Sequence, residues 1–291
     1  ELSSYQTEVA NSLTPDVAVF TNFTPDHLER HGGIGGYYAA KKRLFISGCP
    51  DRSVIGVDEF EGKLLAQELA DHLHDDRIIR VSGSRKITNL GWTVFANKGF
   101  LSEYRRGKQV ASLDLREFKA LQGSHNHQNA CAAYAVVRSL GIGPGSIAKA
   151  LKSFTGLAHR SQLVTEISGV VFINDSKATN VESAMKSLET FPKVRWICGG
   201  EQKEEDISRL NNVLTNVKKA YVIGTNTAKF SSQISCEFEI CNTMDIAVKK
   251  AFNDASDGET VLLAPATASF DQYSSFEERG KAFEYEIKKL M

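Results

Sequence analysis

Short apolar runs alternate with longer mixed segments along most of the chain, and this pattern predicts an α/β fold. In the first half, apolar runs at residues 17–23, 53–57 and 78–82 have the length of buried strands. Helical segments are expected at residues 37–46 and 62–74, between these strands. Strands that are separated by helices are typical of a parallel sheet.

The stretch at residues 92–115 alternates between apolar and polar side chains, so we expect antiparallel hairpins there. Gly99 and Gly107 mark the turns. An alanine-rich helix is predicted at residues 126–140, and a second helix at residues 146–154. The first half is therefore expected to combine a parallel sheet with hairpins.

Strands and helices alternate more regularly beyond Arg160. Strands are expected near Val164 and at residues 170–174, 194–198, 220–223 and 260–263. This rhythm predicts a Rossmann-like, doubly wound and mostly parallel sheet. We therefore predict two domains, residues 1–160 and residues 161–291.

Charge and composition exclude several classes of partner. The 291 residues carry 35 basic and 35 acidic side chains, so no overall field favours nucleic acid or an anionic membrane. No apolar run approaches the roughly 20 residues that a membrane-spanning helix needs. The five cysteines show no CxxC pairing, which indicates buried thiols in a reducing compartment.

Small and polar residues follow four predicted strands of the second half, at residues 174–180, 199–203, 224–226 and 264–269. Parallel strands bring such loops to one sheet edge, where ligands of open α/β sheets bind. Lys177 and Lys203 add positive charge, so we predict a site for an anionic small molecule, a carboxylate or a phosphate. Two simpler explanations stay open. Ser, Thr and Asn favour helix N-caps, and the glycines suit tight turns.

Glu1, His27 and Lys41 are the unusual residues of the first half. A carboxylate and an imidazole on loops could hold a divalent cation, although a lone loop histidine is more often an ordinary surface residue. The His-Asn-His-Gln-Asn stretch at residues 125–129 fits no standard zinc spacing. We interpret it as a helix start whose amides turn toward a base or sugar.

Nearly the whole chain resembles the Mur ligase family, in family order. The matching stretches are residues 1–6, 26–27, 37–41, 123–129, 156–160, 174–180, 264–273 and 276–280. The string Asn-Asp-Ser-Lys-Ala-Thr-Asn at residues 174–180 points to the branch that adds D-glutamate. The resemblance implies a partial central ATP-binding domain followed by the Rossmann-like domain.

The resemblance also implies a reaction. ATP would phosphorylate the carboxylate of UDP-N-acetylmuramoyl-L-alanine, and the amine of D-glutamate would attack the acyl phosphate, giving a peptidoglycan precursor. Catalysis of this kind depends mainly on positioning and charge neutralisation. The implied partners are these small molecules with ATP and Mg²⁺, and not nucleic acid or membrane. We expect a monomer in a bacterial cytoplasm, or alternatively in a plastid stroma.

The family's site residues carry over by position. Positions that the resemblance makes catalytic are Lys41, His27, Lys177 and Lys203. Those that match magnesium ligands are Glu1, His27 and Lys41, the last as a carbamate. Nucleotide contacts match Asn126, Asn129, Arg160 and Asp175. Positions around D-glutamate are Thr179, Lys203, Ser269, Phe270 and Phe276.

The chain departs from the family pattern in two places. Around residues 199–204 the family has Gly-Gly-x-Asp-Lys-Gly, whereas this chain reads Gly-Gly-Glu-Gln-Lys-Glu, which leaves the role of Glu201 open. No Gly-x-x-x-x-Gly-Lys-Ser/Thr phosphate loop is present. In the family that loop and a UDP-binding domain lie upstream of the position of Glu1. We therefore expect the chain to begin inside the central domain and to be inactive alone.

Two other functions remain open. A truncated homologue could keep the glutamate-binding domain and be non-catalytic. A ligase similar to folylpolyglutamate synthetase would have the same reaction type with another acceptor. The string at residues 174–180 argues against the second alternative.

Overall fold

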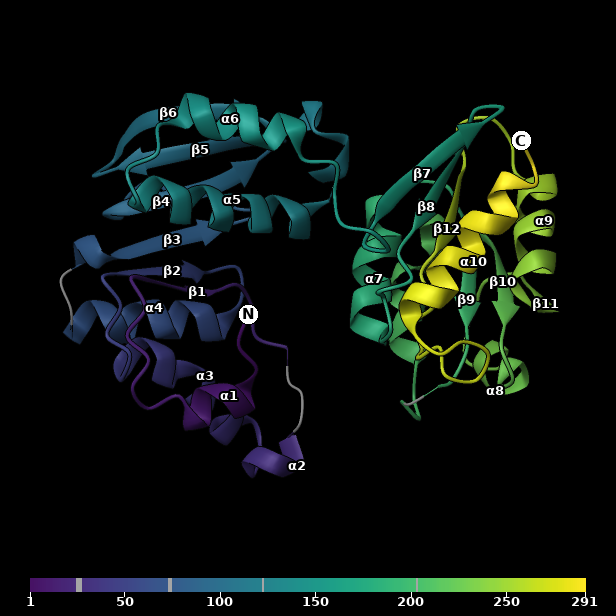
Figure 1. Cartoon of the computed structure of the whole chain (residues 1–291), viewed down its shortest axis with the longest axis horizontal. Coiled ribbons are helices and arrows are strands. Elements are labelled where there is room, and N and C mark those ends of the chain that lie inside the picture. The colour runs from purple at the N-terminus through teal and green to yellow at the C-terminus, as the bar shows by residue number, and fades with distance from the viewer. Residues whose placement is uncertain (25–27, 73–74, 122, 203) are drawn as a thin grey trace. The chain divides into compact units, whose positions relative to one another are not determined.

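The computed structural model describes residues 1–24, 28–72, 75–121, 123–202 and 204–291. The chain forms two compact units, Glu1–Phe154 (the N-terminal unit) and Thr155–Met291 (the C-terminal unit; Figure 1). The sequence predicts the domain boundary after Arg160, slightly beyond the observed boundary after Phe154. Residues 155–160 belong with the second unit because, for example, the His159 carbonyl accepts a hydrogen bond from Lys177 N at 2.9 Å.

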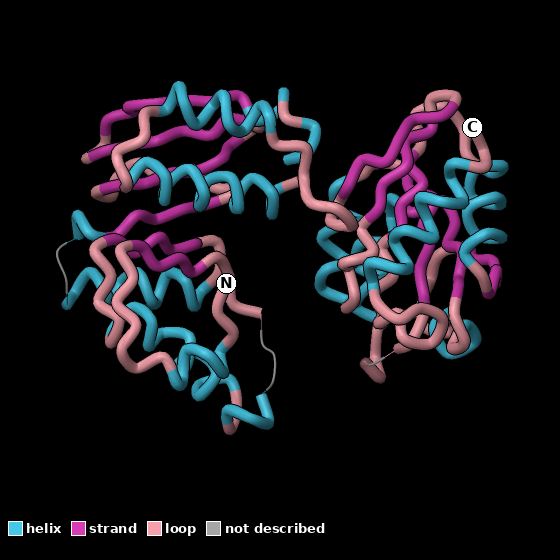
Figure 2. The backbone as a smooth tube through the Cα atoms, viewed as in Figure 1, coloured by secondary structure: helices cyan, strands magenta, loops and turns pink. Residues whose placement is uncertain are grey.

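The N-terminal unit contains one six-stranded sheet in the order β1-β2-β3-β4-β5-β6. Its strands are drawn in magenta in Figure 2. Its first four strands are parallel, namely β1 (Val17–Phe20), β2 (Arg52–Gly56), β3 (Ile78–Ser82) and β4 (Trp92–Asn97). The last two, β5 (Phe100–Arg105) and β6 (Lys108–Asp114), extend the sheet as antiparallel hairpins. The expected strands and hairpins of this half are confirmed.

Helices cover both faces of this sheet. Neighbouring residues of β2 point to opposite faces, with Val54 packed toward α5 (Ser124–Ser139) and Ile55 toward α4 (Phe60–His72). The α5 face also carries α6 (Pro144–Ser153), and the α4 face carries α3 (Ile34–Ile46). The remaining helical segments are α1 (Ser4–Val9), α2 (Leu28–His31), and the 3₁₀ turns η1 (Asp75–Arg77), η2 (Leu115–Glu117) and η3 (Lys119–Leu121).

The C-terminal unit has a second six-stranded sheet, in the order β11-β10-β9-β12-β8-β7. The strands are β7 (Gln162–Ile167), β8 (Val170–Asn174), β9 (Val194–Gly199), β10 (Val217–Ile223), β11 (Phe238–Asn242) and β12 (Thr260–Leu263). All pair in parallel except β7, which is antiparallel to β8. The predicted doubly wound sheet is confirmed, and β11 is an edge strand that the apolar pattern did not indicate.

Two helical layers enclose this second sheet. Trp196 of β9 packs with α7 (Val181–Thr190), η4 (Ser208–Asn216) and α8 (Thr227–Ser231). Ile197, the next residue, packs on the other face with α9 (Met244–Asp254) and α10 (Phe276–Lys288). This alternation explains why the strands are continuous apolar runs, since both of their faces are buried.

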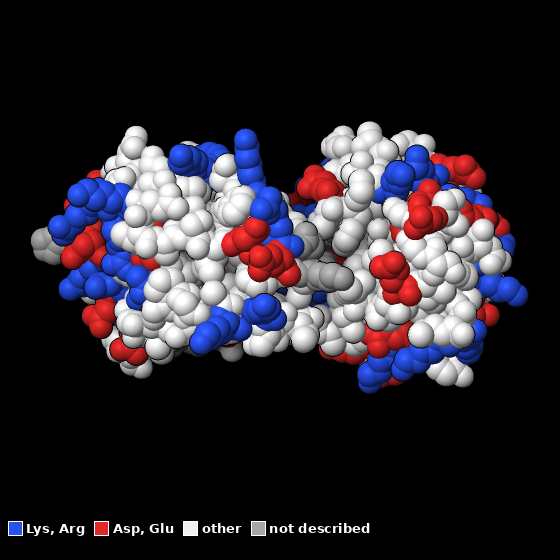
Figure 3. Space-filling view, turned by 90° about the horizontal axis from the view of Figure 1, so that it is seen from above, with Lys and Arg blue, Asp and Glu red and all other residues white. Residues whose placement is uncertain are grey.

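Charged side chains and cysteines occur in both units. Both signs of charge are interspersed on the visible face of each unit (Figure 3). Within the described residues, every helix is too short or too polar to cross a membrane. All five cysteines are free thiols; Cys131, Cys198 and Cys241 are buried, as expected, whereas Cys49 is exposed and Cys236 is half-buried.

Candidate functional site

Four loops meet at the carboxyl edge of the C-terminal sheet. The strands β8, β9, β10 and β12 are parallel, so their carboxyl ends lie at one edge. Because β12 is inserted between β8 and β9, the loops that follow these three strands are direct neighbours. Ala266 N, for example, donates to Ala178 O at 2.9 Å, and Glu201 N donates to Ala268 O at 3.0 Å. The predicted gathering of polar loops at one edge is thus present.

Asn174, the last residue of β8, fastens this strand to α10. Its side chain is fully buried, and its Nδ2 lies 3.1 Å from Gly280 O and 3.0 Å from both Glu284 Oε1 and His159 Nδ1. A Cβ on Gly280 would lie 2.2 Å from His159 Nδ1, so only glycine allows this approach. The start of α10 is therefore held directly against the end of β8.

Asp175 is a buried carboxyl beside an exposed arginine. Its Oδ1 accepts a hydrogen bond from Ser161 N at 3.1 Å, and Asp175 as a whole is 7% exposed. Burial raises the pKa of Asp175, while the nearby charge of Arg160 acts in the opposite direction. The structure thus brings together Arg160 and Asp175, both of which the sequence assigned to the nucleotide.

Lys177 and Phe276 are also close neighbours. The exposed lysine places its Nζ 4.2 Å from the centroid of the Phe276 ring, a cation–π contact. The ring of His159 meets the same phenyl ring edge-on, with centroids 6.4 Å apart. A positive charge is therefore held above an aromatic surface at the start of α10, within the expected D-glutamate site.

The other residues expected near D-glutamate differ in exposure. Ser269 is 2% exposed and Phe270 is 63% exposed, and Thr179 is half-buried. Asn180 is the N-cap of α7, because its side chain accepts from Ser183 N at 2.9 Å. The simple capping explanation therefore holds for Asn180. Lys203 lies outside the described residues.

The strand-end glycines first serve the packing of the protein itself. A Cβ on Gly200 would lie 2.5 Å from Ala268 O, and one on Gly224 would lie 2.6 Å from Asp271 Oδ2. Asp271 Oδ2 in turn accepts from Thr225 N at 2.9 Å. These glycines therefore let the loops after β9 and β10 pack against the loop after β12. Both glycines also have positive φ angles, +136° at Gly200 and +95° at Gly224, which fits the simpler explanation that they serve tight turns.

Sequence reasoning missed Arg279, which is buried beneath these loops. It is 1% exposed, and its guanidinium donates to Ser176, Thr267 and Ala268. Burial lowers the pKa of Arg279 to about 10, so the group remains charged at neutral pH. Its sequence context, Glu-Glu-Arg-Gly, is typical of a solvated helix face and gave no sign of this burial.

In the N-terminal unit, Lys41 lies on α3 and is half-buried. Its Nζ is 5.0 Å from the centroid of the Tyr37 ring. Glu1 is exposed, just before α1, and His27 lies outside the described residues. No three His, Cys, Asp or Glu side chains in the described part of the chain cluster as metal ligands would. Because His27 lies outside the described residues, the structure does not test the expected set of Glu1, His27 and Lys41.

The predicted nucleotide contacts Asn126 and Asn129 lie in the first two turns of α5. Asn126 is half-buried and Asn129 is exposed. Between them, Gln128 Nε2 donates to Asp58 Oδ2 at 2.9 Å. The Asp58 carboxylate also accepts from Ser82 Oγ, Gly83 N and Ser84 Oγ at 2.5, 2.8 and 3.0 Å. Asp58, which the sequence did not single out, thus ties α5 to the carboxyl ends of β2 and β3.

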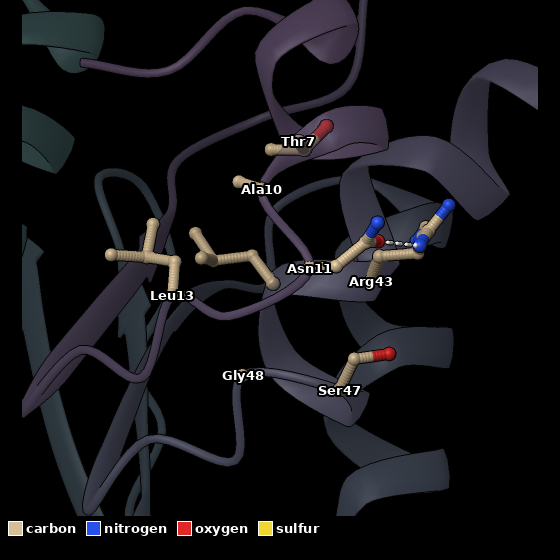
Figure 4. Close-up of a pocket in the computed structure, with 8 residues that line it drawn as sticks. Thr7, Ala10, Asn11, Leu13, Arg43, Ser47 and Gly48 are labelled. Atoms are coloured by element: carbon tan, nitrogen blue, oxygen red, sulfur yellow. Dashed lines mark hydrogen bonds between the residues drawn. The ribbon is translucent and has the colours of Figure 1, made fainter.

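A shallow hollow lies elsewhere in the N-terminal unit, between the C-terminal ends of α1 and α3 (Figure 4). Arg43 on one wall donates to Asn11 Oδ1 on the other at 2.5 Å. The hollow measures about 250 Å³ with open solvent included. This is below the usual size of ligand pockets, and no predicted site residue lines it. The hollow therefore does not mark the site.

Two families match the chain. Residues 1–137 match the Mur ligase middle domain, and residues 159–267 match the Mur ligase glutamate ligase domain. The UDP-N-acetylmuramoylalanine–D-glutamate ligases of Ruegeria pomeroyi and Roseobacter denitrificans are both 60% identical over 291 residues. The alignments include all of this chain and 62% and 63% of those proteins, so the chain spans less than two thirds of their length.

Solved structures share the fold. The MurF ligase from Thermotoga maritima in complex with ADP aligns with a TM-score of 0.69 at 17% identity, over 100% of this chain and 66% of that one. The Escherichia coli FolC in complex with DHPP and ADP gives 0.64 at 20% identity, over 95% and 62%. At such low identity these similarities establish the architecture alone.

Proposed function

The chain belongs to the Mur ligase family, and we propose that its protein joins D-glutamate to UDP-N-acetylmuramoyl-L-alanine at the expense of ATP. The observation that carries this proposal is the carboxyl edge of the C-terminal sheet. There a lysine charge is held over Phe276, beside a loop that contains the buried Ser269. A fixed cation with nearby polar groups suits an amino acid that carries two carboxylates.

Each candidate has a definite role in this proposal. Lys177 neutralises negative charge on the bound substrates, and Lys203 pairs with a carboxylate of D-glutamate. Thr179, Ser269, Phe270 and Phe276 shape the site around that substrate. Asp175 offers a buried oxygen to a nucleotide hydroxyl, with Arg160 beside it. In the N-terminal unit, Asn126 and Asn129 present their amides to the nucleotide from the first turns of α5.

We further propose that Glu1, His27 and a carbamylated Lys41 hold Mg²⁺. An ammonium group repels a metal ion, whereas a carbamate supplies oxygen ligands of the kind that Mg²⁺ prefers. The half-buried position of Lys41 on α3, against the Tyr37 ring, supports this assignment over an ordinary, fully exposed surface lysine. When bound, Mg²⁺ neutralises phosphate charge during transfer. Small-molecule substrates, a monomeric state and a bacterial cytoplasm belong to the same proposal.

The test is a phosphate-release assay on the full gene product that contains this chain. The substrates are UDP-N-acetylmuramoyl-L-alanine, D-glutamate, ATP and Mg²⁺, and L-glutamate replaces D-glutamate in a control. We expect release that requires the D-isomer, with a product whose mass has increased by one glutamyl residue. Release only with a folate acceptor and L-glutamate would favour the folylpolyglutamate alternative. Absence of release with either pair would favour a non-catalytic homologue.

Lys41→Ala provides a further arm of this assay. The variant should lose nearly all activity and regain part of it with added acetate, whose carboxylate replaces the carbamate. Lys42→Ala is the matched control, because the neighbouring Lys42 pairs with Glu68 at 2.7 Å. Full activity of unrescued Lys41→Ala would contradict the carbamate assignment.

A further inference from the structure

Arg279 is a buried cation whose guanidinium donates hydrogen bonds only to uncharged oxygens among the described residues. Nε donates to Ser176 Oγ at 3.1 Å, and Nη2 donates to Ser176 O at 3.0 Å and Thr267 O at 3.1 Å. Nη1 donates to Thr267 O and Ala268 O, both at 3.1 Å. Across the described residues, no carboxylate forms an ion pair with this guanidinium. Asp271 and Tyr273 act on it only at longer range.

The bonded oxygens belong to two loops that carry expected substrate contacts. Ser176 lies between Asp175 and Lys177 in the loop after β8. Thr267 and Ala268 immediately precede Ser269 in the loop after β12. These two loops are far apart in sequence, yet one planar group binds both of them. A guanidinium can do this because its donors lie in a rigid fork, whereas an ammonium is a single point charge.

The same arginine also fixes the start of its own helix. Ser176 Oγ accepts from Arg279 Nε and donates to Phe276 O at 2.7 Å. Phe276 is the first residue of α10 and carries Lys177 over its ring. Displacing the guanidinium would therefore release Ser176, the Phe276 backbone and the loop of Ser269 together.

We propose that Arg279 is a positioning residue for the acidic amino-acid substrate, which it serves by holding Lys177, Phe276 and Ser269 in one arrangement. Its own charge, retained beneath the loops, adds positive potential to a site for carboxylates. It does not touch the substrate itself, because it is only 1% exposed. This inference rests on the proposed function for the identity of the substrate, but the bonding arrangement itself does not.

The test compares Arg279→Lys with Arg195→Lys in the full gene product. Both substitutions keep the positive charge and replace the forked guanidinium with a single ammonium group. Arg195 pairs with Glu259 at 2.7 Å near the amino end of β9, at the opposite edge of the sheet. In Arg279→Lys we expect the KM for D-glutamate to rise about tenfold or more, as for lost hydrogen bonds to a charged group, with the KM for ATP changed less than about twofold. Arg195→Lys should leave both constants near wild type.

Hydrogen–deuterium exchange provides a readout that needs no substrate. In Arg279→Lys, amides at residues 175–180 and 265–273 should exchange faster than in wild type, while those of β9 and β10 should not. If wild type turns over no D-glutamate, the proposed function fails, and the exchange data still decide whether Arg279 positions the loops.

Three results would overturn the inference. They are an unchanged KM for D-glutamate, an equal rise for both substrates, and unchanged exchange in the two loops. If Arg279→Lys does not fold, Ser176→Ala decides instead, because it removes only the hydroxyl that joins Arg279 to Phe276. A selective but smaller rise in the KM for D-glutamate supports positioning, and no rise contradicts it.

Discussion

The two sheets of this protein organise their carboxyl edges around charges of opposite sign. In the N-terminal unit, the Asp58 carboxylate collects donors from β3, from the loop after it and from α5. In the C-terminal unit, the Arg279 guanidinium collects carbonyl oxygens from two loops. In both units a buried or half-buried charge holds the loops that follow parallel strands. The N-terminal unit uses a carboxylate, and the C-terminal unit uses a guanidinium.

The difference has an electrostatic consequence. An anionic centre disfavours bare phosphate or carboxylate nearby, so a nucleotide close to Asp58 would need cations for compensation, such as Arg85, whose Nε is 3.8 Å from Asp58 Oδ1. A cationic centre favours carboxylates directly. Under the proposed function, the cationic centre lies beneath the edge that receives the carboxylates of D-glutamate.

Substitution of Asp58 and of Arg279 should have the largest effects on stability, and these effects should differ between the two units. The Asp58 side chain is 22% exposed, so water can replace it, whereas Arg279 is 1% exposed. We expect Arg279→Met to lower the free energy of unfolding by about 3 kcal/mol, because buried carbonyls lose a charged donor. For Asp58→Ala we expect about 1–2 kcal/mol. Urea unfolding with exchange measured separately in each unit checks this, and a larger loss for Asp58→Ala would reverse the ranking.

Glycines at both edges give a second, smaller test. A Cβ on Gly83 would lie 2.3 Å from Ser124 O, and a Cβ on Gly200 would lie 2.5 Å from Ala268 O at a φ of +136°. Alanine at either position should cost about 1–3 kcal/mol, and more at Gly200 because its backbone conformation is itself nearly restricted to glycine. Gly145→Ala, with no atom within 4 Å, is the control and should be close to neutral. Thermal unfolding that ranks Gly145→Ala with the other two would refute the packing argument.

Asp175→Asn should have the smallest effect and the opposite sign. Burial raises the pKa of Asp175, so the fold favours the protonated carboxyl, and this contribution is lost as pH rises through the folded-state pKa. The asparagine variant should match wild type below an Asp pKa of about 3.9 and become more stable than wild type above it. Under the proposed function, the variant should also lose ligase activity, because Asp175 is the carboxylate proposed to contact the nucleotide. Thermal midpoints measured across this pH range would contradict the argument if the variant were less stable at neutral pH.

Most of the fold could be predicted because apolar runs report burial directly. The strands β1 to β5, β8 to β10 and β12 each contain buried residues, and their apolar sequences show it, whereas β6 and β7 contain only half-buried and exposed residues. The edge strand β11 reads Phe-Glu-Ile-Cys-Asn and pairs with β10 alone, so it needs no long apolar run. Its place in the sheet depends on neighbours that are distant in sequence.

The candidate site was predictable only where the chemistry is local. The strand-end string that contains Asp175 and Lys177 stands out because polar residues interrupt an apolar pattern. Arg279 and Asp58 do not stand out in the sequence, because their hydrogen-bond partners lie far away in the chain. Ser176 is 103 residues from Arg279, and Gln128 is 70 residues from Asp58. Burial of such a charge is a property of the assembled loops, which no local pattern encodes.

The late position of β12 in the chain constrains how the C-terminal sheet assembles. Thr260–Leu263 comes last in the chain among the six strands of this sheet, yet it pairs with both β8 and β9 at the centre of the sheet. Until it emerges from the ribosome, β7–β8 and β9–β10–β11 are two separate half-sheets with unpaired edges. Folding of this unit must therefore wait for nearly its whole length, and the growing chain is exposed to misassociation until one four-residue strand joins the halves.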